Sequence, residues 1–297
     1  MQTMSNVIRE PRPLPEGTAS RGILRMPVGF GLTVGPRQGP GGRDFNGTWS
    51  RNTTLSVAFR SDPDAVGELL PPGFEPAASG RVVVQALYNT DFAWLAGRGY
   101  NWVEVLFDAT YRGSRDVVDG EFVAVMWESI PDPVLPGREE IGLPKMFADI
   151  PAWESAAGDT TVRASWDGFE FCTLTLDGLD LAPWDTSQEE TAVPSRAGLS
   201  GSGHRMYYKY IPRTGSWAEA DAAYATCSPP ANYEVKVLQT WEGAGSVAFH
   251  EATWEQLPTL VHIVNPLAAL PVLGPGEARM SRVLLAFNDL ADQRILR

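Results

Sequence analysis

Short apolar runs separated by turn residues fill the chain from Thr53 onward, and they constrain its fold more than any other feature. The runs are rich in β-branched and aromatic residues, which is typical of strands, and Gly, Pro, Asp and Asn interrupt them. Many short strands at this spacing indicate a largely antiparallel sheet or barrel. We expect strands at 54–59, 81–87, 103–111, 122–127, 161–166, 170–176, 206–211, 233–240, 246–250 and 281–287.

Signals for helices are few. The best begins at Asp62, an N-cap residue followed by Pro63 at the first helical position, and it ends before Pro71. A second short helix is expected near Leu257, and a third around 289–296. The sequence therefore predicts an α+β, β-rich fold in which a few helices lie at the periphery of the sheets.

The N-terminal part of the chain differs from the rest. Three prolines lie between residues 11 and 15, and glycines and prolines return over 35–42 with little periodicity. This composition indicates an extended tail rather than a folded element, although a proline-rich run is also a possible ligand for a partner. No repeat of fixed period and no linker follow. We expect an irregular tail and lead-in over 1–44 and one domain over 45–297.

Charge and composition exclude several functions. The chain has 36 acidic and 24 basic residues and a net charge of -12, so nucleic acid and membrane surfaces are not expected partners. No apolar stretch approaches the ~20 residues that span a bilayer, and the first 22 residues lack the apolar segment of a signal peptide, so a cytoplasmic location is expected. Cys172 and Cys227 stand alone, and the three histidines show no metal-ligand spacing.

Lysine is scarce in this sequence, and the three lysines are Lys145, Lys209 and Lys236. Lysine differs from arginine because it can lose its proton and attack a carbonyl. At pH 7 only about one part in 10³ to 10⁴ of an ordinary lysine is neutral, so a lysine nucleophile needs burial in apolar surroundings, which lowers its pKa. For Lys145, such surroundings are expected from Ile141, Leu143, Met146 and Phe147.

The segment around this lysine carries the most specific pattern. It reads Gly137-Arg138-Glu139, then a short apolar stretch, then Pro144-Lys145. This pattern resembles the active-site segment of the acetoacetate decarboxylase family, whose Schiff-base lysine follows that proline. Weaker matches occur in the same order along the chain, at 57–62, 69–71, 111–113, 208–212, 241–243 and 265–267.

The resemblance implies a fold in which antiparallel sheets form a cone-like barrel, with no metal and no organic cofactor. It implies that Lys145 forms a Schiff base with a small keto acid, as in a decarboxylase-like lyase, and that the protein is a homo-oligomer. One position departs from the pattern, because a second lysine follows the catalytic lysine of the decarboxylases and Met146 stands there in this chain. Aldol, dehydration or cyclisation chemistry on a 2-oxo acid therefore stays open, as does a non-catalytic ligand-binding role.

Further site residues follow from the same resemblance. It implies a glutamate near the start of the strand at 103–111, and Glu104 is our candidate for the acid–base catalyst. Trp102 stands at the ungapped position of this match and is predicted to contact the substrate. The family also has an arginine just before its first strand, suited to a substrate carboxylate. Arg51 is the candidate for this arginine, although Asn52 occupies the matching register.

Three residues beside the lysine complete the predicted substrate site. These are Glu139, Met146 and Phe147. Glu139 has an alternative role, since it could form a structural ion pair with Arg138 that holds the loop. Aromatic residues such as Trp102 and Phe147 are also common in plain hydrophobic cores.

Overall fold

The structure is a computed structural model that describes residues 22–182, 203–216, 218–228, 233–287 and 293–297. Its strands are β1 Trp49–Arg60, β2 Phe74–Pro76, β3 Arg81–Thr90, β4 Asn101–Arg112, β5 Val117–Glu128, β6 Lys145–Phe147, β7 Glu154–Ala156, β8 Asp159–Trp166, β9 Phe169–Leu181, β10 His204–Pro212, β11 Ala220–Ser228, β12 Tyr233–Phe249, β13 Gly276–Phe287 and β14 Arg294–Ile295. Its α-helices are α1 Pro63–Gly67, α2 Val134–Pro136 and α3 Val261–Ala268. Shorter helical turns are Val28–Phe30, Pro40–Gly42, Ala93–Leu95 and the π-helical turn η5, Gly137–Ile141.

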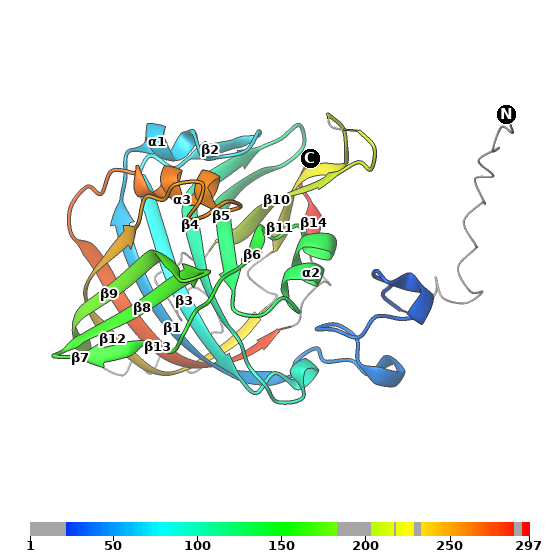
Figure 1. Cartoon of the computed structure of the whole chain (residues 1–297), viewed down its shortest axis with the longest axis horizontal. Helices are drawn as coiled ribbons and strands as arrows, with labels where there is room; N and C mark the ends of the chain where they lie inside the picture. Colours follow the sequence, from blue (N-terminus) through cyan, green and yellow to red (C-terminus); the bar gives the residue numbers. More distant parts are fainter. Residues whose placement is uncertain (1–21, 183–202, 217, 229–232, 288–292) are drawn as a thin grey trace, which may run out of the picture.

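All these strands belong to one 14-stranded sheet. Its order is β14-β11-β10-β5-β4-β3-β1-β13-β12-β9-β8-β7, while β2 pairs with β4 and β6 pairs with β5. Pairing is antiparallel except between β5 and β10 and between β5 and β6. Within the described ranges the two ends of this order do not pair, so the sheet is strongly curved but not closed by hydrogen bonds (Figure 1). The predicted α+β, β-rich fold is confirmed.

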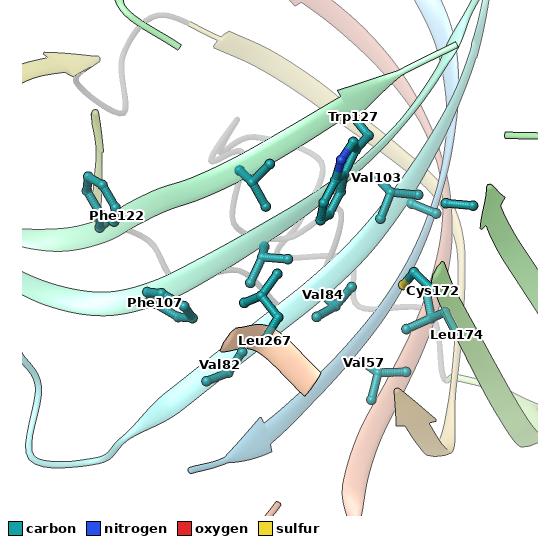
Figure 2. Packing of buried hydrophobic residues seen from close by; sticks show 14 of the residues in the cluster. Val57, Val82, Val84, Val103, Phe107, Phe122, Trp127, Cys172, Leu174 and Leu267 are labelled. Carbon is teal, nitrogen blue, oxygen red and sulfur yellow. The ribbon is translucent and has the colours of Figure 1, made fainter. Parts of the chain in front are cut away.

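The sheet curls around one large apolar core (Figure 2). The rings of Trp127 on β5 and Phe171 on β9 lie 5.0 Å apart between centroids, although β4, β3, β1, β13 and β12 separate these two strands in the sheet. Val264 and Leu267 of α3 pack into the same core. The curvature therefore comes from burying one face of distant strands against each other, with α3 packed into the core that they enclose.

The opposite face of the same strands carries a second, smaller cluster. On β1, alternation points Leu55 and Val57 into the large core and leaves Thr54 and Ser56 on the opposite face. Apolar residues there include Val83, Leu87, Trp102, Leu106, Met126, Ile141 and Tyr207. Polar side chains are buried among the strands of this face, which distinguishes it from the large core. It is this face that holds the candidate site.

Most strand predictions hold, and the exceptions are informative. The runs at 233–240 and 246–250 form one continuous strand, β12, and the alanine-rich β11 was not predicted. Asp62 caps α1 as expected, because its Oδ1 accepts a hydrogen bond from Asp64 N at 3.1 Å. The helix predicted near Leu257 appears as α3.

The helix predicted at 289–296 is wrong for its last part, because Arg294 and Ile295 form β14 beside β11. Residues 289–292 lie outside the described residues, as do the prolines of 11–15. Residues 22–44 follow an irregular path with two short helical turns, and the predicted boundary at residue 44 stays a prediction. The single domain over 45–297 stays a prediction. Across the described part of the chain, no helix combines the length and apolarity needed to cross a bilayer.

Candidate active site

Lys145 begins β6, a three-residue strand that lies parallel to the end of β5. Its side chain is buried, with the residue 8% exposed. The amine Nζ lies 2.6 Å from Glu128 Oε1 and donates a hydrogen bond to the Pro133 carbonyl oxygen at 3.1 Å. The amine of Lys145 is therefore held away from bulk water between two oxygens.

Gly137 in η5 provides the space for this lysine. A Cβ added at Gly137 would lie 2.5 Å from Lys145 Cδ and 2.6 Å from its Cε, well inside van der Waals contact. The backbone of Gly137 has φ -61° and ψ -44°, which any residue can adopt. Glycine at this position thus leaves room for the lysine side chain where it lies, and a larger residue would make the end of that side chain shift.

Two further contacts hold the same loop. Arg138 Nη1 donates to the backbone oxygen of Lys145 at 2.9 Å, and Lys209 Nζ donates to the backbone oxygen of Glu139 at 2.5 Å. Arg138 therefore positions β6 through its backbone, and no described ion pair joins it to Glu139. The side chain of Glu139 is partly exposed, and the described contacts of the amine are with Glu128 and Pro133 rather than with Glu139.

Glu104 lies two strands from the lysine on the same face. In the ladder of β4, β5 and β6, Met126 pairs with Glu104 on one side and with Lys145 on the other. Glu104 is 1% exposed. Its Oε1 accepts a hydrogen bond from Gln85 Nε2 at 2.5 Å, and its Oε2 forms a very short ion pair with Arg205. Both carboxylate oxygens of Glu104 are therefore engaged.

Glu128 is a second buried carboxylate, and no sequence pattern predicted it. It ends β5, is fully buried, and meets Lys145 Nζ through Oε1. Its Oε2 accepts no hydrogen bond from any described residue. Burial raises the pKa of Glu128 and the nearby charge of Glu104 adds to the rise, while Lys145 opposes it. The amine thus faces a carboxyl group whose proton affinity is increased.

Arg205 supplies the cation of this site, and the sequence did not reveal it. It lies on β10, which joins the sheet by parallel pairing with β5, and it contacts Glu104 from there. Arg205 also interacts with the buried Tyr207. Burial raises the pKa of Tyr207, and the charge of Arg205 opposes this rise. No local motif marks Arg205, because it reaches the site only through a pairing between strands about 80 residues apart in sequence.

The predicted substrate arginine lies elsewhere. The side chain of Arg51 is 73% exposed and pairs with Asp91 at 2.9 Å. Alternation along β1 places Asn52, and not Arg51, on the face that holds Glu104, where Asn52 Nδ2 donates to Asn89 Oδ1 at 2.8 Å. The structure therefore does not bring Arg51 to the lysine.

The remaining predicted residues divide between the two faces. Trp102 is buried in the smaller cluster directly across from Glu128, and its Nε1 has no described hydrogen-bond partner. Met146 packs against the large core instead, and Phe147 is 42% exposed. Of the apolar enclosure expected around Lys145, Ile141 and Leu143 lie in or against the smaller cluster. The structure thus groups Lys145, Glu104 and Trp102 on one face, and adds Glu128 and Arg205.

Comparisons with known proteins show which fold and family the chain has. Among solved structures, an acetoacetate decarboxylase is 12% identical with a TM-score of 0.62, and the match covers 87% of this chain and 94% of that one. An acetoacetate decarboxylase from Legionella pneumophila is 15% identical with a TM-score of 0.59, and the match covers 87% of this chain and 92% of that one.

A third similar structure is the enduracididine biosynthesis enzyme MppR, in complex with the condensation product of pyruvate and imidazole 4-carboxaldehyde. It is 17% identical with a TM-score of 0.57, and the match covers 83% of this chain and 88% of that one. At these identities the likeness shows the fold. No curated protein sequence matches the chain at a significant level. The sequence model of the family described as acetoacetate decarboxylase matches residues 25–286, and the chain therefore belongs to the acetoacetate decarboxylase family.

Proposed function

We propose that the chain is a cofactor-free lyase in which Lys145 forms an imine with the carbonyl of a small keto acid. The observation that carries the proposal is the buried amine, which is packed against Gly137 and lies 2.6 Å from Glu128 Oε1. An amine in this setting can reach its neutral, nucleophilic form by giving its proton to a neighbouring oxygen, without release of charge into a buried site. Family membership supports the same reaction type.

Several reactions share the intermediate. The iminium carbon withdraws electrons, so that decarboxylation, retro-aldol cleavage, dehydration and cyclisation can all proceed from it. A decarboxylase-like reaction is our first choice because acetoacetate decarboxylases are among the similar structures. Aldol, dehydration or cyclisation chemistry on a 2-oxo acid is the alternative, and the pyruvate condensation product in MppR supports this substrate class.

In this proposal Lys145 is the nucleophile, and Glu104 and Arg205 provide fixed charge on the same face of the sheet. Trp102, across the ladder from Glu128, is the proposed apolar contact for the substrate. Among the described residues no group of three His, Cys, Asp or Glu is arranged to hold a metal ion.

The test is reduction with borohydride in the presence of pyruvate or acetoacetate, followed by mass analysis of the labelled peptide. We expect a covalent adduct on Lys145 that is absent in Lys145→Arg, since arginine cannot form the imine. Lys236→Ala is the matched control, because Lys236 lies over the ring of Trp49 outside this site, and it should label like the parent chain. Absence of an adduct on Lys145 with either keto acid would refute imine formation with these substrates.

A non-catalytic ligand-binding protein is the second candidate. The observation in its favour is that Lys145 is ion-paired to Glu128, while Met146 stands where the decarboxylases have a second lysine. In that case Lys145→Ala should bind pyruvate as tightly as the parent chain in calorimetry, and the parent chain should show no turnover.

We also propose that the protein is a homo-oligomer, and its cytoplasmic location stays a prediction. Apolar side chains of the lead-in are exposed, and the most exposed is Phe30 at 89%. The others are Met26, Val28, Leu32 and Val34. Exposed apolar groups of this kind mark interaction surfaces. Light scattering after size exclusion should show a multiple of the 32.3 kDa chain mass, reduced in Phe30→Asp.

A further inference from the structure

Two buried carboxylates face the candidate site, and their surroundings differ. Glu104 has both oxygens engaged, one by the amide of Gln85 and one by the guanidinium of Arg205. Glu128 has one cationic contact, Lys145 Nζ at 2.6 Å from Oε1, and neither of its oxygens accepts a hydrogen bond of good geometry among the described residues. Donors thus contact both oxygens of Glu104, as suits a carboxylate. Glu128 lacks such donors, and a proton on one of its oxygens would reduce the cost of burying it.

This difference separates the two groups chemically. A carboxylate that accepts from a guanidinium and an amide is stabilised in its charged form. The charged groups that face Glu128 are the Lys145 ammonium, which favours its anion, and the Glu104 carboxylate, which disfavours it. Burial is the largest influence and raises the pKa of Glu128. Two carboxyl groups in such different surroundings can divide the roles of fixed charge and proton carrier.

We propose that Glu128 is the catalytic residue that carries protons during imine formation at Lys145, and that Glu104 pairs with Arg205 and takes no part in the proton transfers. This assignment deepens the proposed function and rests on it. It moves the acid–base role from Glu104, the residue favoured by the family resemblance, to a residue that touches the reacting nitrogen.

The steps balance in protons and bonds. The Lys145 ammonium gives one proton to Glu128 Oε1, which leaves a neutral amine beside a carboxylic acid. The amine then attacks the keto carbon, a C–N bond forms, and the former carbonyl oxygen receives a proton that leaves the nitrogen, so the product is a neutral carbinolamine. Glu128 next protonates the hydroxyl group, the C–O bond breaks and water departs. The iminium remains beside a Glu128 carboxylate, which has returned to its starting charge.

A purely structural counter-ion would behave differently. If Glu128 only stabilised the Lys145 ammonium, its removal would favour the neutral amine and would speed imine formation at neutral pH. If Glu128 carries protons, its removal slows the reaction, and a small carboxylic acid that diffuses into the vacated space restores it. The sign of the rate change therefore separates the two roles.

The experiment measures the rate of borohydride-trapped adduct formation with pyruvate, by mass, in the full chain and its variants. In Glu128→Gln we expect trapping to slow by about 10²-fold or more, the usual contribution of a positioned acid–base group. In Glu128→Ala, added formate should restore trapping in proportion to its concentration. In Glu104→Ala, formate should have no such effect. Circular dichroism verifies that each variant is folded, and Glu128→Met, an apolar replacement of similar length, should be as slow as Glu128→Gln.

The outcomes are distinguishable. Trapping in folded Glu128→Gln at or above the parental rate, or a formate response confined to Glu104→Ala, would overturn the role of Glu128 and leave the proposed function standing. Failure of the parent chain itself to form an adduct with pyruvate or acetoacetate would overturn the proposed function, and the role of Glu128 with it.

Discussion

Replacement of Gly137 by alanine tests whether Lys145 reacts from the position that the structure gives it. An added Cβ would lie 2.5 Å from Lys145 Cδ and 3.0 Å from Nζ, whereas carbon atoms in contact prefer a separation of about 3.5–4.0 Å. The end of the lysine side chain must therefore move by about 1 Å or more. A misplacement of this size near the reacting atoms costs on the order of 10²-fold in rate.

The fold itself should tolerate this change. Alanine is favoured over glycine by about 0.5–1 kcal/mol in a helical conformation, and Gly137 has helical φ and ψ angles. Overpacking costs about 1–3 kcal/mol, so we expect a net loss of at most ~2.5 kcal/mol in the free energy of unfolding, together with the ~10²-fold slower trapping. The assay pairs urea unfolding with the rate of borohydride-trapped adduct formation with pyruvate.

Gly67→Ala is the matched control. Gly67 ends α1, and the nearest atom to an added Cβ is Pro76 Cγ at 3.4 Å, an ordinary contact. This variant should trap the adduct at the parental rate. If folded Gly137→Ala also trapped at the parental rate, the lysine would have to react from another position, and the steric argument would be refuted.

Three further predictions concern charged groups inside the site and outside it. Arg205→Met leaves the buried Glu104 without its cation, and urea unfolding should show a loss of about 3 kcal/mol or more. Arg51→Ala removes only an exposed ion pair with Asp91, so its unfolding free energy should change by less than about 1 kcal/mol and its trapping rate should not change. Burial raises the pKa of Glu128 in the native state above its value in the unfolded chain. The contribution of Glu128 to the free energy of unfolding is therefore fully present below the ordinary pKa of glutamate. It is lost as the pH rises through the raised pKa of the native state. The stability of the parent chain relative to Glu128→Gln should therefore fall with rising pH across that range, and an opposite slope in urea midpoints would contradict this reasoning.

Local patterns predicted most of the strands because each strand carries its own signal. Successive side chains of β1 and β4 point to opposite faces of the sheet, and both faces are buried along most of each strand. The pair Asp62-Pro63 specifies the start of α1 by itself. The alanine-rich β11 was missed because alanine has little strand preference. Its neighbours in the sheet decide its conformation.

The lysine was predictable for a similar reason, since its loop carries a contiguous pattern from Gly137 to Lys145. Arg205 and Glu128 were not predictable from such a pattern. Parallel pairing of β10 with β5 brings Arg205 to the site, and parallel pairing of β6 with β5 brings Lys145 beside Glu128. No sequence spacing encodes either pairing. Arg51 illustrates how a shift of one residue matters, because successive residues of a strand face opposite sides of the sheet.

The ion pairs of the lead-in bear on how far the chain can be shortened. Arg25 and Arg37 pair with Glu140 at 2.5 Å and 3.0 Å, and all three side chains are largely buried. A truncated protein that began at Phe45 would retain every strand but would leave Glu140 without either cation, on the turn that carries Gly137. Loss of a buried partner costs about 3–5 kcal/mol, so truncation should loosen the lysine's enclosure before it unfolds the sheet. A shortened chain that preserves this turn should therefore retain both Arg25 and Arg37.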